Sequence, residues 1–408
     1  MEKTNGNKGK IAILAVTFIV LSNSIISSIL AGMAKSFPDV TPTGIQFVMT
    51  LGMVAAFLST LVAGVLAQKI SMKTIVLIAL IALLLGGLMP LVLHANIMQI
   101  YVSAVLIGIG QGFCIPMVQT YVARLYEGKE KSQMFGWQTA SKNAGAMILL
   151  IVAGIFAAKN WTHAYYVYFI VIPILVVAIL FLPKGEPLGK ENEAKKEHTG
   201  KIPFGTLGII ILIGLFCIGY STEALNISVF LDQKGLGGAT AASMAMSITT
   251  AMGIVAGIIF SKFLKVFKGY VFTIACASVA VGNIIIFNTS SLTVVYLASI
   301  FVGLGFGLGL TSTSDAISRT ATSHQMAMSM SIYASSTTIG ASVSPFVING
   351  LTSGIMTLNS VNVFLISGIF MLVVAVLSGV WGLVNRAYYE EEKYETNYRF
   401  SYIYRGYF

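Results

Sequence analysis

The sequence consists of long apolar runs separated by short polar segments. Reading the runs between polar breaks gives twelve candidate spans, with the boundaries 11–33, 44–67, 74–94, 98–122, 133–158, 164–183, 204–231, 239–261, 269–288, 292–316, 326–350 and 361–385. A helix needs about 20 residues to cross a hydrocarbon core about 30 Å thick. Charged residues make up 10% of the chain, against about 25% in soluble domains, so a wetted surface is missing. We therefore expect an all-α membrane protein with twelve transmembrane helices.

The distribution of Lys and Arg predicts how these helices are oriented. If the N-terminus lies in the cytoplasm, the inside segments hold 21 of the 25 basic residues, whereas the outside loops hold Lys35, Lys159 and Lys234, and Lys142 lies within a span. Such a bias is typical of a multi-pass protein of the cell membrane with both termini in the cytoplasm. It also accounts for the net charge of +10 without a nucleic-acid partner. The first span follows three lysines, but its length and the lack of an A-x-A site predict an uncleaved helix.

The longest hydrophilic stretch between spans, 184–203, divides the chain near its middle. We expect an N-terminal six-helix half at 1–183, a cytoplasmic central loop at 184–203 and a C-terminal six-helix half at 204–385. The tail at 386–408 is rich in tyrosine, with arginines between the rings. We interpret it as a cytoplasmic segment at the level of the lipid headgroups rather than as a docking motif.

An internal repeat links the fourth and fifth spans to the tenth and eleventh. Eight residues recur at a constant offset of 195: Tyr101, Gly108, Gly110, Gly112, Arg124, Ser141, Gly145 and Ala146 correspond to Tyr296, Gly303, Gly305, Gly307, Arg319, Ser336, Gly340 and Ala341. Parallel repeats of six helices are related by an axis along the membrane normal, with a substrate site between them near mid-depth.

Twelve spans, a charged central loop and paired glycine-rich fourth and tenth spans together resemble the major facilitator superfamily of secondary transporters. The resemblance implies two pseudo-symmetric six-helix halves that work by alternating access. Segments such as Ser36-Phe-Pro-Asp-Val resemble bacterial drug-efflux-like members. The loop after the second span departs from the family motif, because it reads Gly64-x-x-x-Gln68-Lys69-x-Ser71-Met72-Lys73 without the usual acidic residue. The fifth span also lacks the Gly-Pro pair of many proton antiporters, which weakens the case for drug antiport.

Glu223 is the carboxyl residue placed furthest inside a predicted span. It lies in the seventh span, about 9 Å to the outer side of the midpoint at 1.5 Å per residue. A charge within a membrane helix costs roughly 3 kcal/mol, and desolvation favours the neutral carboxyl. We expect Glu223 to couple transport to protons. The alternative is a structural carboxyl that is bonded to a neighbouring helix or solvated at the outer mouth.

Lys142 is a second charged residue within a span, in Thr139-Ala-Ser-Lys-Asn143-Ala-Gly145. A lysine facing lipid can extend its amine to the headgroups. The small and polar neighbours instead favour a packed or wet face, where Lys142 would bind an anionic substrate or pair with a carboxylate in one conformation. Both interpretations remain open.

In the resembled family, the first, fourth, seventh and tenth helices line the cavity, and charges near the inner surface close it. Asp315 lies four residues before Arg319, so the two side chains share one face of a helix. We expect a cytoplasmic gate made by Gln68, Lys69, Lys73, Asp315, Arg319, Lys262 and Lys265. An ordinary ion pair of Asp315 with Arg319 at the helix end is nearly as good an interpretation of Asp315. Neutral candidates for substrate binding, besides Lys142, are Asn23, Gln111, Gln119, Tyr220 and Asn226; each also suits a helix–helix hydrogen bond.

Several other function classes are disfavoured. The four histidines lie in loops or at span ends without metal-ligand spacing, and the three cysteines lie in apolar runs, so we expect no metal, cofactor or disulfide. No glycine-rich phosphate loop with a lysine is present, which disfavours an ATP-driven pump. We predict a monomeric secondary transporter, not an enzyme, that exports amphipathic or anionic small organic molecules with protons. Proton-coupled uptake of a small organic anion and a solute sensor are the alternatives.

Overall fold

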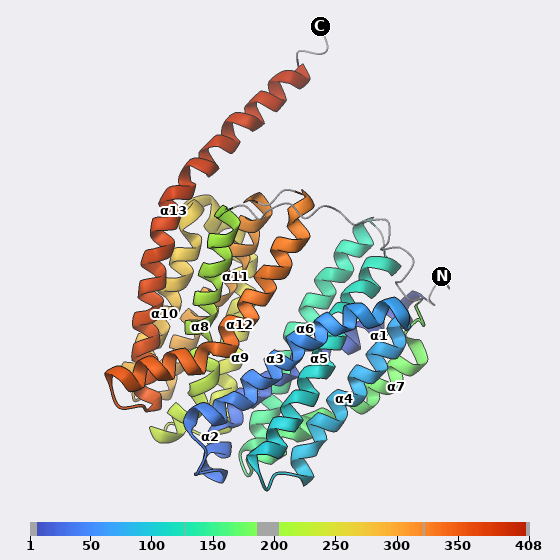
Figure 1. Ribbon diagram of the computed structural model, residues 1–408, viewed down its shortest axis with the longest axis vertical. Coiled ribbons are helices and arrows are strands. Elements are labelled where there is room, and N and C mark those ends of the chain that lie inside the picture. The colour runs from blue at the N-terminus through green and yellow to red at the C-terminus, as the bar shows by residue number, and fades with distance from the viewer. Residues whose placement is uncertain (1–5, 127, 186–203, 321–322, 405–408) are drawn as a thin grey trace.

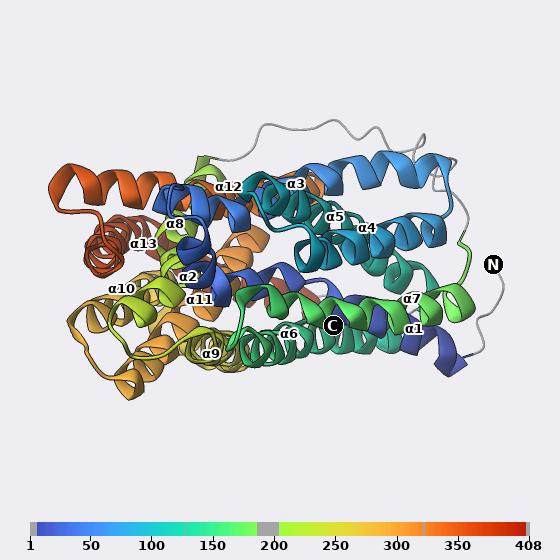
Figure 2. The same cartoon turned by 90° about the horizontal axis from the view of Figure 1, so that it is seen from below.

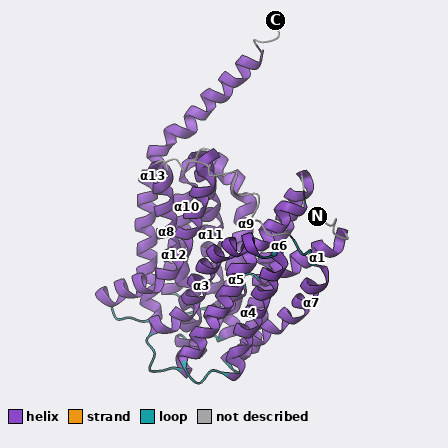
Figure 3. Cartoon of the chain, turned by 45° about the vertical axis from the view of Figure 1, so that its right-hand side comes forward, coloured by secondary structure: helices purple, strands orange, loops and turns teal. Residues whose placement is uncertain are grey.

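The computed structural model describes residues 6–126, 128–185, 204–320 and 323–404. In this part of the chain the regular structure is helical, and short loops join the helices (Figure 3). Eleven helices are long and apolar enough to cross a membrane by their length and composition. The fold is therefore an all-α membrane fold, as the sequence predicts.

The N-terminal half contains seven α-helices and two 3-10 segments within the described residues. They are α1 (Gly6–Ile19), η1 (Ser22–Ile25), α2 (Ile26–Ser36), α3 (Pro42–Lys69), α4 (Met72–Val92), α5 (Ile97–Leu125), α6 (Gly128–Ala157), η2 (Trp161–Ile170) and α7 (Val171–Phe181). The first span is thus broken into α1, η1 and α2, and the sixth into η2 and α7.

The C-terminal half follows the same order of long helices. Its elements are α8 (Phe204–Gln233), α9 (Ala239–Phe267), η4 (Lys268–Tyr270), α10 (Val271–Asn288), α11 (Leu292–Thr320), α12 (Ser323–Ile355) and α13 (Ser360–Tyr404). Figure 1 shows the two halves side by side, with α13 continuing away from the bundle.

Each predicted span has a counterpart among these helices. Besides the two broken spans, α12 and α13 differ from expectation. The 33-residue α12 is not among the eleven apolar spans, because Ser, Thr and Gly dilute its hydropathy. The last helix does not end at 385 but continues to Tyr404. The sequence from 383 to 404 contains neither Pro nor Gly, so nothing in it stops a helix.

Local sequence fixes several helix starts. Thr41 caps α3 by accepting a 3.1 Å hydrogen bond from the backbone N–H of Gly44, and Pro42 follows at the first helical position. Asn96 and Gln99 form a reciprocal capping box at the start of α5. These short polar segments end one apolar run and begin the next.

The repeated glycines let helices approach at backbone distance. A Cβ added to Gly108 of α5 would lie 2.2 Å from the carbonyl oxygen of Gly52 in α3. A Cβ added to its repeat partner, Gly303 of α11, would lie 2.3 Å from the carbonyl oxygen of Thr249 in α9. The same kind of contact therefore joins α3 to α5 and α9 to α11.

The repeated serines make equivalent hydrogen bonds in the two halves. Ser141 of α6 donates to the carbonyl oxygen of Leu14 in α1 at 2.9 Å. Its partner Ser336 of α12 donates to the carbonyl oxygen of Ile210 in α8 at 2.7 Å. The offset of 195 found in the sequence is thus also an offset in helix packing.

Hydrogen bonds and an ion pair join the two halves near the end of the bundle where α2 and α8 stop and α3 and α9 begin. Figure 1 shows the ribbons of the halves converging at this end and diverging towards the other, and Figure 2 views the same arrangement from below. We call it the joined end; the basic segments around 68–73 and 262–268 lie at the opposite end.

Candidate functional site

Glu223 is buried at a junction of three helices in the C-terminal half. Its side chain on α8 is 1% exposed. Ser299 of α11 donates a 2.6 Å hydrogen bond to Oε1, and Thr249 of α9 donates a 2.9 Å hydrogen bond to Oε2. Each carboxylate oxygen therefore has one hydroxyl donor, which partly compensates for the loss of water.

The same three groups can also accommodate a protonated carboxyl. A protonated Glu223 would have one O–H to donate, so one hydroxyl would have to change from donor to acceptor. Thr249 Oγ1 lies 3.3 Å from the carbonyl oxygen of Ser299, which offers its hydrogen a second acceptor. The hydroxyl can thus turn to that carbonyl and accept from Glu223 with no change in the positions of the heavy atoms.

The matching junction of the N-terminal half contains an amide instead of a carboxylate. There Gly52 and Ala104 stand where the repeat places Thr249 and Ser299, at offsets of 197 and 195. A Cβ added to Gly52 would lie 2.8 Å from Oδ1 of Asn23 and 3.2 Å from the carbonyl oxygen of Ala104. No residue in the described part of the chain donates a hydrogen bond to that buried Oδ1 atom. The two halves are therefore alike in packing and different in chemistry at this position.

Lys142 lies half-buried on α6, beside the serine that bonds α1. Among the described residues, none gives its amine a hydrogen bond or an ion pair. Close packing on the same helix comes from Gly145, whose added Cβ would lie 1.9 Å from the carbonyl oxygen of Phe18. The amine is thus available to a ligand or to lipid headgroups, the two possibilities that the sequence left open.

The neutral candidates lie in different surroundings. Asn226 is buried at the joined end, where Nε2 of Gln46 donates to its Oδ1 at 2.7 Å. Tyr220 stacks on Phe306, with ring centroids 4.2 Å apart. The remaining three differ in exposure: Asn23 and Gln111 are buried, and Gln119 is exposed.

The predicted gate residues lie at the end opposite to the joined end. Lys73 donates to the carbonyl oxygen of Ile179 at 2.6 Å, a contact within its own half. Asp315 is half-buried, and the side chain of Arg319 lies outside the described residues. The other four, Gln68, Lys69, Lys262 and Lys265, lie at the same end; Gln68 and Lys69 are exposed.

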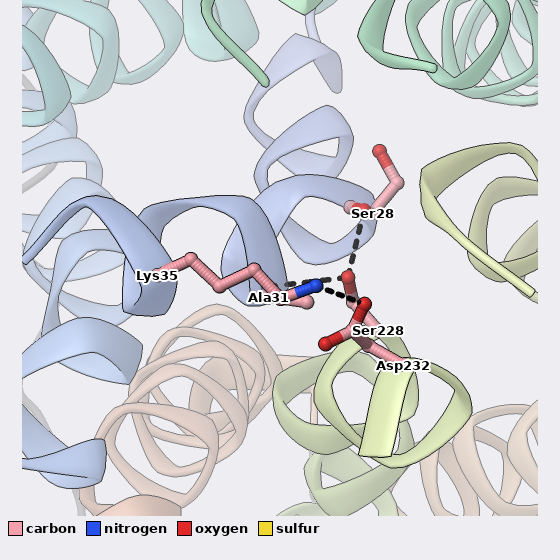
Figure 4. Close-up of polar contacts among 5 residues, drawn as sticks. All are labelled: Ser28, Ala31, Lys35, Ser228 and Asp232. Atoms are coloured by element: carbon pink, nitrogen blue, oxygen red, sulfur yellow. Dashed lines mark hydrogen bonds and ion pairs between the residues drawn. The ribbon is translucent and has the colours of Figure 1, made fainter. Parts of the chain in front are cut away.

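Sequence reasoning missed the polar contacts that join the halves. In Figure 4, Lys35 of α2 forms a 2.5 Å ion pair with Asp232 of α8, and Ser228 donates to the carbonyl oxygen of Ser28 at 2.8 Å. Deeper in the same region, Asn349 of α12 donates to Oε1 of Gln46 at 2.8 Å. Opposite charges at the ends of the first and seventh spans were a usable signal, because the repeat predicts that these two spans are related by symmetry.

Comparison with known proteins identifies the fold and the family. The family model described as Major Facilitator Superfamily matches residues 12–345. A crystal structure of a mutant of the nucleoside transporter NupG matches with a TM-score of 0.76 at 14% identity, covering 92% of this chain and 99% of that one. A POT family transporter in complex with 5-aminolevulinic acid matches with a TM-score of 0.70 at 16% identity, covering 90% and 96%. The chain belongs to the Major Facilitator Superfamily and is a multi-pass membrane transporter, not an enzyme.

Proposed function

We propose that this protein is a proton-coupled secondary transporter that exports small organic molecules with a negative charge or an amphipathic character. Glu223 carries the proton and Lys142 attracts the charged group of the substrate. Both termini lie in the cytoplasm of a cell whose plasma membrane the helices cross. Reporter fusions test this orientation: a fusion in the 289–291 loop should report the outside, and a cytoplasmic signal there would contradict it.

The observation that carries the proton role is the three-helix junction around Glu223. Its two hydroxyl partners supply donors to a carboxylate, and one of them has a second acceptor for the moment when the carboxyl takes up a proton. A group that only holds helices together has no need of a second arrangement. Glu223 is also three residues from Asn226, which contacts the other half at the joined end. A change in the charge of Glu223 can therefore act along α8 on the contacts between the halves.

The contacts between the halves, which lie at the joined end, support alternating access. Rocking of two rigid halves requires contacts that break at one end as others form at the opposite end. The contacts at the joined end come from ends of helices, and two of the groups involved, Lys35 and Asp232, are partly exposed. If the basic loops are cytoplasmic, this conformation is closed to the outside and would receive substrate from the cytoplasm.

The substrate class rests on Lys142. A half-buried amine without a partner among the described residues is a ready site for a carboxylate or phosphate group. The partly buried ring of Tyr220, stacked on Phe306, offers an aromatic surface for an apolar part. Export is the direction suggested by the resemblance of the sequence to efflux-like members.

The experiment is flux through proteoliposomes across a panel of organic anions, neutral analogues and cations, with internal pH recorded at the same time. The proposal predicts that some anions move against their gradient when a proton gradient is imposed, and that proton movement accompanies them. Accumulation of an anion on the side towards which protons flow would indicate uptake with protons instead of export. Specific binding without flux would instead identify a solute sensor.

A further inference from the structure

The C-terminal half contains a small pocket that the transport proposal does not use. It has a volume of about 50 Å³ and lies at the end opposite to the joined end. Its lining comes from α8, α9, α10, α11, α13 and the α9–α10 connection, and includes Leu212, Phe272, Ser312, Ala316 and Lys268. Of the helices that line it, α10 and α13 lie on the side of this half that faces away from the other half (Figure 2).

The repeat shows how the corresponding positions of the N-terminal half differ. Positions 312 and 316 of α11 correspond at the offset of 195 to Met117 and Tyr121 of α5. Both of these side chains are 1% exposed, and the hydroxyl of Tyr121 donates to the carbonyl oxygen of Pro183 at 2.6 Å. Large side chains therefore fill the space in the N-terminal half, whereas Ser312 and Ala316 leave it open.

A third difference places a positive charge at the pocket. Gly110 packs on the carbonyl oxygen of Ala79, and Gly305 packs on that of Ala275, so α4 and α10 correspond at an offset of 196. At that offset the fully buried Met72 corresponds to Lys268, which is exposed and lines the pocket.

The backbone at Lys268 is unusual. Within the described chain, Lys268 is the non-glycine residue with a positive φ, at 49°. Residues with a side chain rarely adopt this conformation. The neighbouring Val266 and Phe267 are 70% and 41% exposed, and Lys265 lies on the same stretch of α9. Apolar side chains next to ammonium groups at the end of a membrane helix are typical of the headgroup level.

We propose that this pocket binds an anionic phospholipid of the adjoining leaflet. The part of one acyl chain nearest the headgroup enters the space that Ser312 and Ala316 leave open, and the phosphate group contacts the amine of Lys268. The lining is mostly apolar, as an acyl chain requires.

The test measures thermal unfolding of the purified full-length chain in detergent, with phosphatidylglycerol or phosphatidylcholine added, and counts bound lipid by native mass spectrometry. A single lysine near the surface contributes enough to change binding of an anionic headgroup by about fivefold. We expect phosphatidylglycerol to raise the melting temperature more than phosphatidylcholine does, and Lys268→Gln to weaken its binding by about that factor. Lys265→Gln is the matched control, because Lys265 is a nearby lysine that does not line the pocket.

A second variant tests the volume rather than the charge. Ala316→Leu should abolish the phosphatidylglycerol adduct while keeping Lys268, and Ser312→Val is measured in its place if that protein is not monodisperse. Inorganic phosphate should give no shift, because the acyl chain is part of the ligand; a shift equal to that of the lipid would indicate a free-phosphate site and overturn the proposal. Equal effects of the two lipids, or wild-type lipid binding by Lys268→Gln and the filled variant, would also overturn it. Neither outcome bears on Glu223 or on transport.

Discussion

Ser299 of α11 donates a 2.6 Å hydrogen bond to Oε1 of Glu223 on α8. The repeat partner of Ser299 is Ala104, which has no hydroxyl, and Asn23 supplies an amide rather than a carboxylate at the corresponding junction of the N-terminal half. The donor and the acid thus occur together in one half. This pairing distinguishes a chemical site from the packing that both halves share.

Removing the hydroxyl of Ser299 should change the environment of the Glu223 carboxyl while leaving the carboxyl in place. Ser299→Ala leaves Oε1 of Glu223 without its donor, and an unsatisfied buried group costs about 1–3 kcal/mol, more when it is charged. We expect slower proton-driven transport and a shift in the pH dependence of transport, measured in proteoliposomes. Ser299→Thr, which keeps a hydroxyl, should restore both; equal behaviour of the Ala and wild-type proteins would show that the bond is not used.

The close approach of α5 and α3 predicts a stability effect at Gly108. A Cβ at this position would lie 2.2 Å from a backbone oxygen, so Gly108→Ala should force the helices apart and destabilise the protein by roughly 1–3 kcal/mol. Gly64→Ala is the control, because no described atom outside its own helical turn lies within 4 Å of the added Cβ. In a helix that change should be neutral or stabilising by up to about 1 kcal/mol. Melting temperatures of the two purified variants should therefore move in opposite directions or differ clearly.

Contacts at the joined end should differ in how much they stabilise this conformation. The side chains of Lys35 and Asp232 are 67% and 30% exposed, and exposed pairs contribute about 0–1 kcal/mol, so Lys35→Ala should shift the conformational equilibrium by about fivefold at most. The buried Gln46 bonds both Asn226 and Asn349. Its loss leaves Oδ1 of Asn226 without its donor, at a cost of about 1–3 kcal/mol, and removes one of the two hydrogen bonds that Nδ2 of Asn349 donates.

Distances between spin labels on either side of the joined end measure this difference. Labels at Asp39 and Ser353, which are exposed in the two halves, should show a larger population of long distances in Gln46→Ala than in Lys35→Ala. The reverse order would mean that the surface ion pair, and not the buried amides, holds this end together.

Lys142 predicts a change in selectivity. Lys142→Ala should reduce transport of anionic compounds several-fold more than that of neutral analogues, while expression and melting temperature stay near wild type, because the amine has no partner among the described residues. Lys142→Arg should retain the preference for anions. Lys159→Ala, a change at an exposed lysine just beyond the same helix, is the control. Unchanged selectivity in Lys142→Ala would support the interpretation that this amine extends to the lipid headgroups.

Much of the fold could be predicted because apolar length and charge bias act locally. The span predicted at 44–67 lies inside α3 (Pro42–Lys69), with Thr41 and Pro42 marking its start. The break in the first span could not be predicted in this way, since Ser22 and Asn23 are polar residues that also occur in unbroken helices. The helical tail to Tyr404 was missed because hydropathy locates membrane spans, not the helices that leave them.

The candidate site could be predicted in part, for a related reason. Glu223 and Lys142 were found because a charge in an apolar span is costly wherever the helix packs. Their partners were not, because Thr249 and Ser299 are ordinary residues of other helices, 26 and 76 positions away along the chain. The contacts of Gln46 with Asn226 and Asn349 cross between the halves and depend on the conformation, which no local pattern contains.

The central claim is that Glu223 carries the proton that drives transport, and Glu223→Gln tests it most directly. The amide keeps the shape and hydrogen bonding of the protonated acid but cannot release a proton. Substrate binding and counterflow should survive, and transport against a substrate gradient driven by a pH gradient should fall to background in proteoliposomes. Asp39→Asn, at an exposed carboxyl, should behave as wild type. Uphill transport by Glu223→Gln with the proton stoichiometry of the wild type would contradict the claim.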